Sequence, residues 1–151
     1  MPDDWQSFGD PWSIRRESES RRIRFADGEV LSVPYDMPII GKNRVNALRL
    51  YQAEGSESAA KTSEYLYPAD DTEEGKLLRL RQEYFLSASA VGELVEGYVK
   101  RHGKDFSRFG ELYAIQLNDT HPVLAVAEFL RILTEKYFVP FGRAVGIAQS
   151  V

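Results

Sequence analysis

One stretch of this chain is patterned like one face of a long helix, and it constrains the fold more than any other feature. From Glu73 onward, apolar residues recur three or four positions apart, at Leu77, Leu80, Tyr84, Ala88, Val91, Val95 and Tyr98. This spacing places them on one side of an amphipathic α-helix. Asp70 or Asp71 can cap its start, and His102-Gly103 is expected to end it.

Shorter patterns before this helix predict β-strands. Arg22–Phe25 and Glu29–Val33 alternate polar and apolar residues around Asp27-Gly28, which is the strongest local signal for a β-hairpin. Three residues are expected to break the chain after the hairpin: Pro34, Pro38 and Gly41. Val45–Ala53 alternates again, which indicates a further strand.

The patterns on either side of the long helix are shorter. Glu54–Ser63 is small and polar, which indicates a loop or the start of a helix. Leu112–Leu117 is a nearly continuous apolar run, as expected of a strand buried on both faces of a sheet. Asp119 or Thr120 would then cap another helix, with Pro122 in its first turn.

Composition and charge exclude several classes of protein. The chain has 151 residues, 43% of them hydrophobic, which is enough for one globular domain with a core. A net charge of -4 lacks the basic footprint of a nucleic-acid binder. The absence of cysteine and the presence of two histidines argue against a metal site.

The apolar runs and the N-terminus bear on location and domain organisation. No apolar run approaches the ~20 residues that a membrane span needs, and the N-terminus lacks the apolar core of a secretory signal. We therefore expect no membrane association and a cytoplasmic location. Residues 1–20 are polar and are expected to form a loosely held arm, followed by a single domain over residues 21–151.

A polar cluster at the junction between the apolar run and the helix after it is the first candidate site. It consists of Asn118, Asp119, Thr120 and His121. Ligands of open α/β sheets bind at the carboxyl ends of strands, and helix N-termini there offer free N–H groups. These residues could therefore bind a polar ligand. Asp and Thr are also ordinary helix caps, so a structural role fits the same sequence.

The adjacent carboxylates Asp70 and Asp71 are the second candidate site. Carboxylate oxygens accept strong hydrogen bonds and can bind sugar hydroxyls. A plain helix cap explains one of them equally well. A glycosidase acid/base pair is not favoured, because that chemistry needs two carboxyls facing each other about 5–10 Å apart.

Five longer strings resemble α-glucan phosphorylases, the glycogen, starch and maltodextrin phosphorylases. They are FGDPWSIRR, VPYDMPIIG, RVNALRLYQAE, YLYPADDTEEGKLLRLRQEYF and AIQLNDTHPVLAVAEFLRIL, and they follow the family's order over nearly the whole chain from Phe8. The resemblance implies an α/β fragment: a partial Rossmann-like N-terminal lobe of a B-type glycosyltransferase fold, with a β-hairpin and one long amphipathic helix.

The resemblance also implies a reaction and a cofactor. In the family, phosphate attacks the terminal α-1,4 bond of a glucan and releases glucose 1-phosphate with retention. The cofactor is pyridoxal 5′-phosphate, whose lysine lies in a C-terminal lobe that this chain lacks. We therefore expect no catalytic and no cofactor-binding residue here, and no activity of the chain alone. The expected partners are α-1,4-glucan, phosphate and a missing C-terminal lobe.

The resemblance extends to the two candidate sites. The string YPADDTEEG is similar to the family's mobile gate loop, in which Asp70 falls on the acidic residue beside the substrate. Asp71 and Ala69 each stand where the family carries an amide. The string NDTHP, from Asn118 to Pro122, matches without a change and implies residues that line the floor near the catalytic pocket.

Other interpretations remain open at this stage. The chain could be a non-catalytic remnant that binds glucan or a partner protein, or a small α/β hydrolase using Asp119 and His121 with no identified nucleophile. Animal members of this allosteric family carry an arginine pair for nucleotide activation where this chain has Glu96-Gly97, so we expect no such regulation. We expect self-association through apolar faces exposed by the missing lobe, of the type of Val91, Val95 and Phe129.

Overall fold

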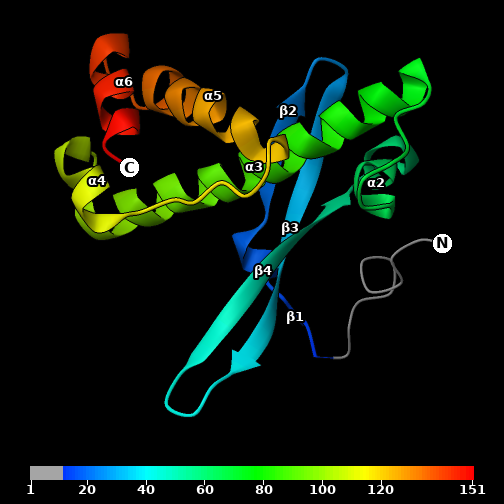
Figure 1. Cartoon of the computed structure of the whole chain (residues 1–151), viewed down its shortest axis with the longest axis horizontal. Helices are drawn as coiled ribbons and strands as arrows, with labels where there is room; N and C mark the ends of the chain where they lie inside the picture. The colour runs from blue at the N-terminus through cyan, green and yellow to red at the C-terminus, as the bar shows by residue number, and fades with distance from the viewer. Residues whose placement is uncertain (1–11) are drawn as a thin grey trace. The chain divides into compact units, whose positions relative to one another are not determined.

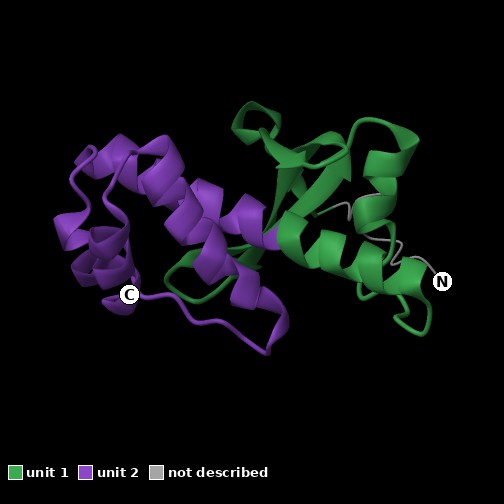
Figure 2. Ribbon diagram, turned by 90° about the horizontal axis from the view of Figure 1, so that it is seen from above, with its two compact units in different colours: residues 1–85 green, residues 86–151 purple. Residues whose placement is uncertain are grey.

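A computed structural model of the chain describes residues 12–151 (Figure 1). The chain divides into two compact units between Phe85 and Leu86 (Figure 2). The long helix α3 (Glu73–His102) contributes its first part to one unit and the remainder to the other. The predicted mixed α/β class is confirmed, with an open antiparallel sheet, a β-hairpin and one long helix, consistent with a partial phosphorylase lobe.

The first unit is built on a four-stranded antiparallel sheet. Its strands are β1 (Ile14–Arg15), β2 (Arg21–Phe25), β3 (Gly28–Ile40) and β4 (Val45–Glu54), and a short 3-10 helix, η1 (Glu17–Glu19), follows β1. β3 pairs with each of the other three strands. The pair Phe25–Gly28 closes the predicted hairpin around Asp27. Gly28 has a φ of 143°, a backbone conformation that residues other than glycine rarely adopt.

The breaks expected at Pro34 and Pro38 are wrong, because β3 continues through both residues, whereas the break expected at Gly41 is confirmed by the end of β3 at Ile40. The carbonyl oxygen of Pro34 accepts a hydrogen bond from the N–H of Arg16 at 2.8 Å, on the side away from β4. The N–H and C=O of one residue in an antiparallel strand point to the same side, so the missing N–H of Pro34 costs the β3–β4 ladder nothing. Pro38, four residues on, has the same orientation.

Two polar clusters hold the start of the described chain to this sheet. Asp36, which is buried, accepts hydrogen bonds at 2.7 Å from the Nε of Arg16 and from the Nε of Arg49. Arg49 also bonds Glu19 at 2.6 Å. The Arg49 guanidinium, with help from Arg16, holds the pKa of the Asp36 carboxyl below its usual range.

The second cluster lies at Arg15, which donates to both carboxylate oxygens of Glu54, and this pairing holds the Glu54 pKa below its usual range. Of the predicted arm over residues 1–20, the first 11 residues lie outside the described part. Within the described rest, Ile14 and Arg15 pair with β3 and the N–H of Arg16 bonds Pro34, and the domain boundary at residue 20 stays a prediction.

Two helix starts follow the sheet. α2 (Glu57–Glu64) confirms the helical interpretation of Glu54–Ser63, and the Ser56 side chain caps it by accepting from the N–H of Ala59 at 3.2 Å. α3 begins at Glu73 as predicted, but its cap is Thr72, whose hydroxyl accepts from the N–H of Gly75 at 3.1 Å. Neither Asp70 nor Asp71 makes this capping bond.

The predicted apolar face of α3 is confirmed only over its later turns. Ala88, Val91, Val95 and Tyr98 are buried, whereas Leu77 is 67% and Leu80 is 52% exposed. The first turns of α3 instead direct Gly75, Arg79 and Gln82 towards the loop that precedes the helix. Because these polar positions face the loop, Leu77 and Leu80 on the opposite side of the helix face outward. Gly103, with a φ of 77°, ends the helix as predicted.

The second unit is helical. Besides the later part of α3 it contains η2 (Phe106–Arg108), α4 (Phe109–Leu112), η3 (His121–Val123), α5 (Leu124–Arg131), the π-helical turn η4 (Ile132–Lys136) and α6 (Phe141–Gln149). Its core is rich in aromatic rings: Tyr98 lies 5.3 Å from Phe106 and 4.9 Å from Phe109, measured between ring centroids. Val91, Val95 and Phe129 belong to this core, so the expectation that these three are exposed is wrong.

The strand predicted over Leu112–Leu117 is also wrong. Tyr113–Asn118 pairs with no strand in the part of the chain that the structure describes, and Leu112 and Leu117 are exposed. Tyr113 and Ile115 pack instead against the helical core. Within residues 12–151, no helix is both long and apolar enough to cross a membrane.

Candidate functional site

The first candidate group lies in the loop between α2 and α3 and carries Asp70 and Asp71. The Asp70 carboxylate accepts a hydrogen bond from Nη1 of Arg79 at 3.1 Å, which joins the loop to the second turn of α3. The same guanidinium lies 5.9 Å from the ring centroid of Tyr67. Asp71 is exposed. The loop thus presents two carboxylates and an exposed tyrosine ring to solvent, which are groups that can bind sugar hydroxyls and ring faces.

Three residues that hold this loop were missed by the sequence analysis: Gly75, Arg79 and Gln82. Each touches the loop or bonds to it. A signal for them exists in the sequence, because positions four and seven residues after Gly75 fall on the same helix face. A stripe of non-apolar residues at helical spacing, beginning next to a polar loop, would have indicated the face that receives the loop.

The second candidate group lies in the other unit, between Asn118 and His121. Asp119 has a φ of 67°, in the left-handed region where Asn and Asp are tolerated best. Its Oδ1 accepts the N–H of Thr120 at 2.9 Å, and its Oδ2 lies 3.7 Å from Nε2 of His121. Asn118 Oδ1 accepts from the side chain of Gln116 at 3.0 Å. The structure therefore brings these four neighbours together at one exposed corner.

The position of this corner differs from the one the sequence predicted. It follows an unpaired extended segment and precedes a three-residue 3-10 helix, η3, so the rule for strand ends does not apply within the described residues. Pro122 lies in the first turn as predicted, but the Thr120 side chain makes no capping bond. The Asp119–His121 pair alone supplies no nucleophile, which gives the hydrolase interpretation no further support.

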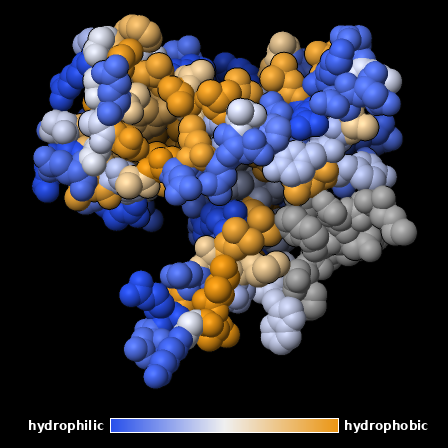
Figure 3. All heavy atoms as spheres, in the orientation of Figure 1, coloured by the Kyte–Doolittle hydropathy of each residue, from blue (hydrophilic) through white to orange (hydrophobic). Residues whose placement is uncertain are grey.

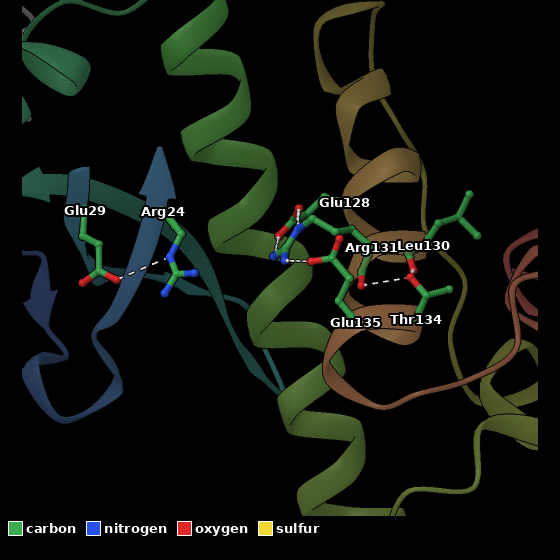
Figure 4. A network of polar contacts seen from close by, with 7 residues as sticks. All are labelled: Arg24, Glu29, Glu128, Leu130, Arg131, Thr134 and Glu135. Atoms are coloured by element: carbon green, nitrogen blue, oxygen red, sulfur yellow. Dashed lines mark hydrogen bonds and ion pairs between the residues drawn. The ribbon is translucent and has the colours of Figure 1, made fainter. Parts of the chain in front are cut away.

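The second unit also contains a buried carboxylate outside the candidate groups, Glu128. Glu128 is 4% exposed, but its two oxygens accept bonds of 2.7 Å each from Nε and Nη2 of Arg131 (Figure 4). Arg131 also bonds Glu135 at 2.9 Å. Because its charge is fully compensated by a bidentate partner on the same helix, Glu128 has a structural explanation.

The described residues do not fit a metal or the family's cofactor. No group of three or more potential ligands for a metal ion occurs among residues 12–151. All six lysines are exposed: Lys42, Lys61, Lys76, Lys100, Lys104 and Lys136. A lysine that holds an aldehyde cofactor as a Schiff base is typically desolvated in a pocket. None of these lysines meets that condition.

The second unit also has an open apolar hollow. It is lined by Val91, Ile115, Leu117, Ala125, Val126, Phe129, Ala148 and Val151. Exposed apolar side chains gather elsewhere too, as on the β3–β4 hairpin, where Ile39, Ile40 and Val45 are exposed (Figure 3). Such a lining suits an apolar protein surface better than a sugar, whose hydroxyls need polar partners.

Comparisons with known proteins agree with one another. The family model described as carbohydrate phosphorylase matches residues 54–151, a range that contains both candidate groups. The glycogen phosphorylase of Bacillus subtilis (strain 168) is 35% identical over 168 aligned residues, covering 90% of this chain and 21% of that protein. The liver form of glycogen phosphorylase from Homo sapiens is 32% identical, covering 98% of this chain and 23% of its own length.

A plant relative gives the same result. The chloroplastic/amyloplastic alpha-1,4 glucan phosphorylase L-1 isozyme of Solanum tuberosum is 31% identical, covering 99% of this chain and 20% of that protein. The chain thus spans about a fifth of the length of the curated relatives it matches.

Proposed function

The chain belongs to the carbohydrate phosphorylase family, and we propose that it forms part of an α-1,4-glucan phosphorylase. The proposed reaction is the phosphorolysis of terminal α-1,4-linked glucose to glucose 1-phosphate. The observation that carries the proposal is the match of one family model to residues 54–151, which include both polar groups. The relatives' printed names, glycogen phosphorylase and alpha-1,4 glucan phosphorylase, support the substrate class.

The proposed role of this chain is to supply glucan-contacting groups. Asp70, oriented by Arg79, would accept hydrogen bonds from sugar hydroxyls, and Asp71 would offer a second carboxylate beside it. Asn118, Asp119, Thr120 and His121 would offer a glucan both hydrogen-bond donors and hydrogen-bond acceptors. All members of the two groups are exposed except His121, which is partly buried, and this supports a role in contact with a ligand rather than in the core.

We further propose that the chain does not catalyse phosphorolysis by itself. The reaction requires phosphate to be placed and its charge neutralised in the transition state. No lysine of this chain fits the cofactor, so pyridoxal 5′-phosphate and the phosphate-binding groups would lie in parts of a phosphorylase outside these 151 residues. A cytoplasmic location remains part of this proposal.

Calorimetry with maltoheptaose tests the glucan-binding part directly. The proposal predicts saturable heat with maltoheptaose and none with a β-1,4-linked glucan of equal length, because the hydroxyl positions differ along the two chains. A variant combining Asp70→Ala with Asn118→Ala should lose the heat while keeping its far-UV circular dichroism. Absence of heat with maltoheptaose from the folded parent chain would remove glucan binding from the account.

A second function is favoured by one observation. The exposed apolar side chains of the β3–β4 hairpin and the apolar hollow of the second unit are suited to protein contacts. We propose as the alternative that the chain is a non-catalytic module that binds a protein partner or associates with itself. A monomeric mass in light scattering at all concentrations would exclude the self-association part of this alternative.

A further inference from the structure

Gln82 lies beneath the loop that carries Asp70 and Asp71. It is 3% exposed, on the face of α3 turned towards that loop. Its Nε2 donates to the carbonyl oxygens of Thr62 at 2.9 Å and Tyr65 at 2.6 Å. Its Oε1 accepts the N–H of Tyr67 at 2.9 Å. One buried amide therefore satisfies three backbone groups, from the last turns of α2 to the start of the loop.

The backbone that Gln82 holds is strained at its centre. Tyr67 has a φ of 54°, a region that a bulky residue such as tyrosine rarely occupies. Residues in such conformations persist where surrounding contacts over-determine them, and they occur often at ligand-binding sites. The bond from the Tyr67 N–H to Gln82 is such a contact, and it lies three residues before Asp70.

Two further contacts continue the attachment along the same helix face. A β-carbon on Gly75 would lie 2.1 Å from the carbonyl oxygen of Ala69, so the loop backbone rests directly on the helix. Arg79 then bonds Asp70 at 3.1 Å. From Gln82 back to Gly75, the first turns of α3 therefore define the path of the loop from Tyr65 to Asp70.

We propose that Gln82 is a positioning residue that holds the loop from Tyr65 to Asp71 in the conformation that presents Asp70 to a glucan. The glucan part of this statement rests on the proposed function. The positioning part does not, because the order of the loop can be measured without any ligand. Gln82 acts through the Thr62, Tyr65 and Tyr67 backbone, and it does not touch the substrate.

Amide hydrogen exchange of the full chain tests the positioning part. Gln82→Met keeps the length and burial of the side chain but removes all three hydrogen bonds. The expected result is exchange of the Tyr67 amide at least about fivefold faster than in the parent, since one lost hydrogen bond is sufficient for such a change. Gln52→Met, on β4, is the matched control and should leave the Tyr67 amide unchanged. Equal exchange in the parent and Gln82→Met would overturn the proposal.

Gln82→Glu supplies a readout that a purely structural role would not move. At pH 7.5 its carboxylate faces two carbonyl oxygens and cannot donate to either. At pH 4.5 a protonated carboxyl donates to one of them and still accepts from Tyr67. The Tyr67 protection factor of this variant is therefore expected to rise as pH falls, whereas that of the parent stays level. The charged groups bonded in this region, which include Arg79 with Asp70 and Glu83 and Arg81 with Asp27, are common to both proteins.

The pH series also carries the test if Gln82→Met does not fold. A Gln82→Glu profile that runs parallel to the parent's would refute the role assigned to the amide. Maltoheptaose calorimetry then separates the two proposals. Faster loop exchange together with at least fivefold weaker maltoheptaose binding supports both. Faster exchange with no binding by the parent retains the loop-holding role of Gln82 and rejects the glucan site.

Discussion

The carbonyl oxygen of Ala69 lies 2.1 Å from the point where a β-carbon on Gly75 would stand. The close approach lets the loop before α3 lie on the helix surface, and it makes glycine necessary at this position. Gly75→Ala is expected to lower the free energy of unfolding by about 1–3 kcal/mol, because the added methyl group must displace loop backbone. Urea unfolding followed by circular dichroism measures this change.

Gly97→Ala is the matched control for that variant, since Gly97 lies in the interior of the same helix. A β-carbon there would meet only the tip of the flexible Arg101 side chain, at 3.3 Å. Alanine favours the helix over glycine, so this variant should be as stable as the parent or up to about 1 kcal/mol more stable. A similar loss of stability in both variants would contradict the close contact at Ala69.

Asp70 and Asp71 are expected to contribute unequally to glucan binding. Asp70 is oriented by Arg79 at 3.1 Å, so less freedom is lost when it accepts a bond from a sugar. Asp70→Asn should weaken maltoheptaose binding about tenfold, the loss of one charge-assisted hydrogen bond. Asp71→Asn should change it by less than about threefold. Calorimetry with maltoheptaose measures the loss of affinity in both variants. Equal losses would show that the bond from Arg79 does not favour Asp70 over Asp71 in glucan binding.

Stability in acid should depend on Asp36. Its folded-state pKa is lowered by Arg49 and Arg16, so its contribution is present above the unfolded pKa of about 3.9. The contribution is lost as the pH falls through the folded pKa, below that value. At pH 7, Asp36→Asn should cost about 2 kcal/mol of unfolding free energy, the value of hydrogen bonds to a charged group. Below pH 4, the unfolding free energy of the Asp36→Asn variant should then fall less steeply with pH than that of the parent.

Asp27→Asn is the control for this pH series. Asp27 also has a lowered pKa, caused by Arg81, but its carboxylate lies at the exposed tip of the hairpin, where water and salt screen the pair. Its replacement should change stability far less than replacement of Asp36. Urea unfolding from pH 3 to pH 7 compares the two, and an equal loss in both would contradict the importance of burial at Asp36.

Self-association is expected through apolar residues other than those first proposed. Phe138 is 83% exposed and has a φ of 57°, a region in which asparagine is favoured over phenylalanine. Phe138→Asn should therefore lower the average mass in light scattering while leaving the helical content unchanged. A parent chain that is monomeric at all concentrations would contradict the expectation.

The parts of the fold that were predicted correctly depend on local chemistry. Asp27-Gly28 makes a tight turn wherever it lies between alternating runs, and the α3 periodicity from Glu73 is independent of its partners. The strand predicted over Leu112–Leu117 failed because an apolar run does not reveal whether its neighbours are strands or helices. Pro34 failed as a breaker because the direction of its missing N–H depends on strand register.

In the candidate site, too, the residues set apart by local sequence could be predicted, and the contacts with distant residues could not. Asp70 and the group from Asn118 to His121 were identifiable from the sequence, because polar residues stand out beside apolar patterns. The partner of Asp70 could not be identified from the sequence, because Arg79 reaches Asp70 only once the loop folds back on α3. The spacing of Gly75, Arg79 and Gln82 indicates the helix face that receives the loop, but it does not reveal the partners of Gln82, which are three backbone groups and leave no trace in residue types.

The most direct test of the account is the formation of glucose 1-phosphate from maltoheptaose and phosphate. The purified chain would be assayed with pyridoxal 5′-phosphate, alone and together with Bacillus subtilis glycogen phosphorylase from which the region aligned with this chain is deleted. The account predicts no product from either protein alone and measurable product from the mixture. Turnover by the chain alone, or none in the mixture, would contradict it.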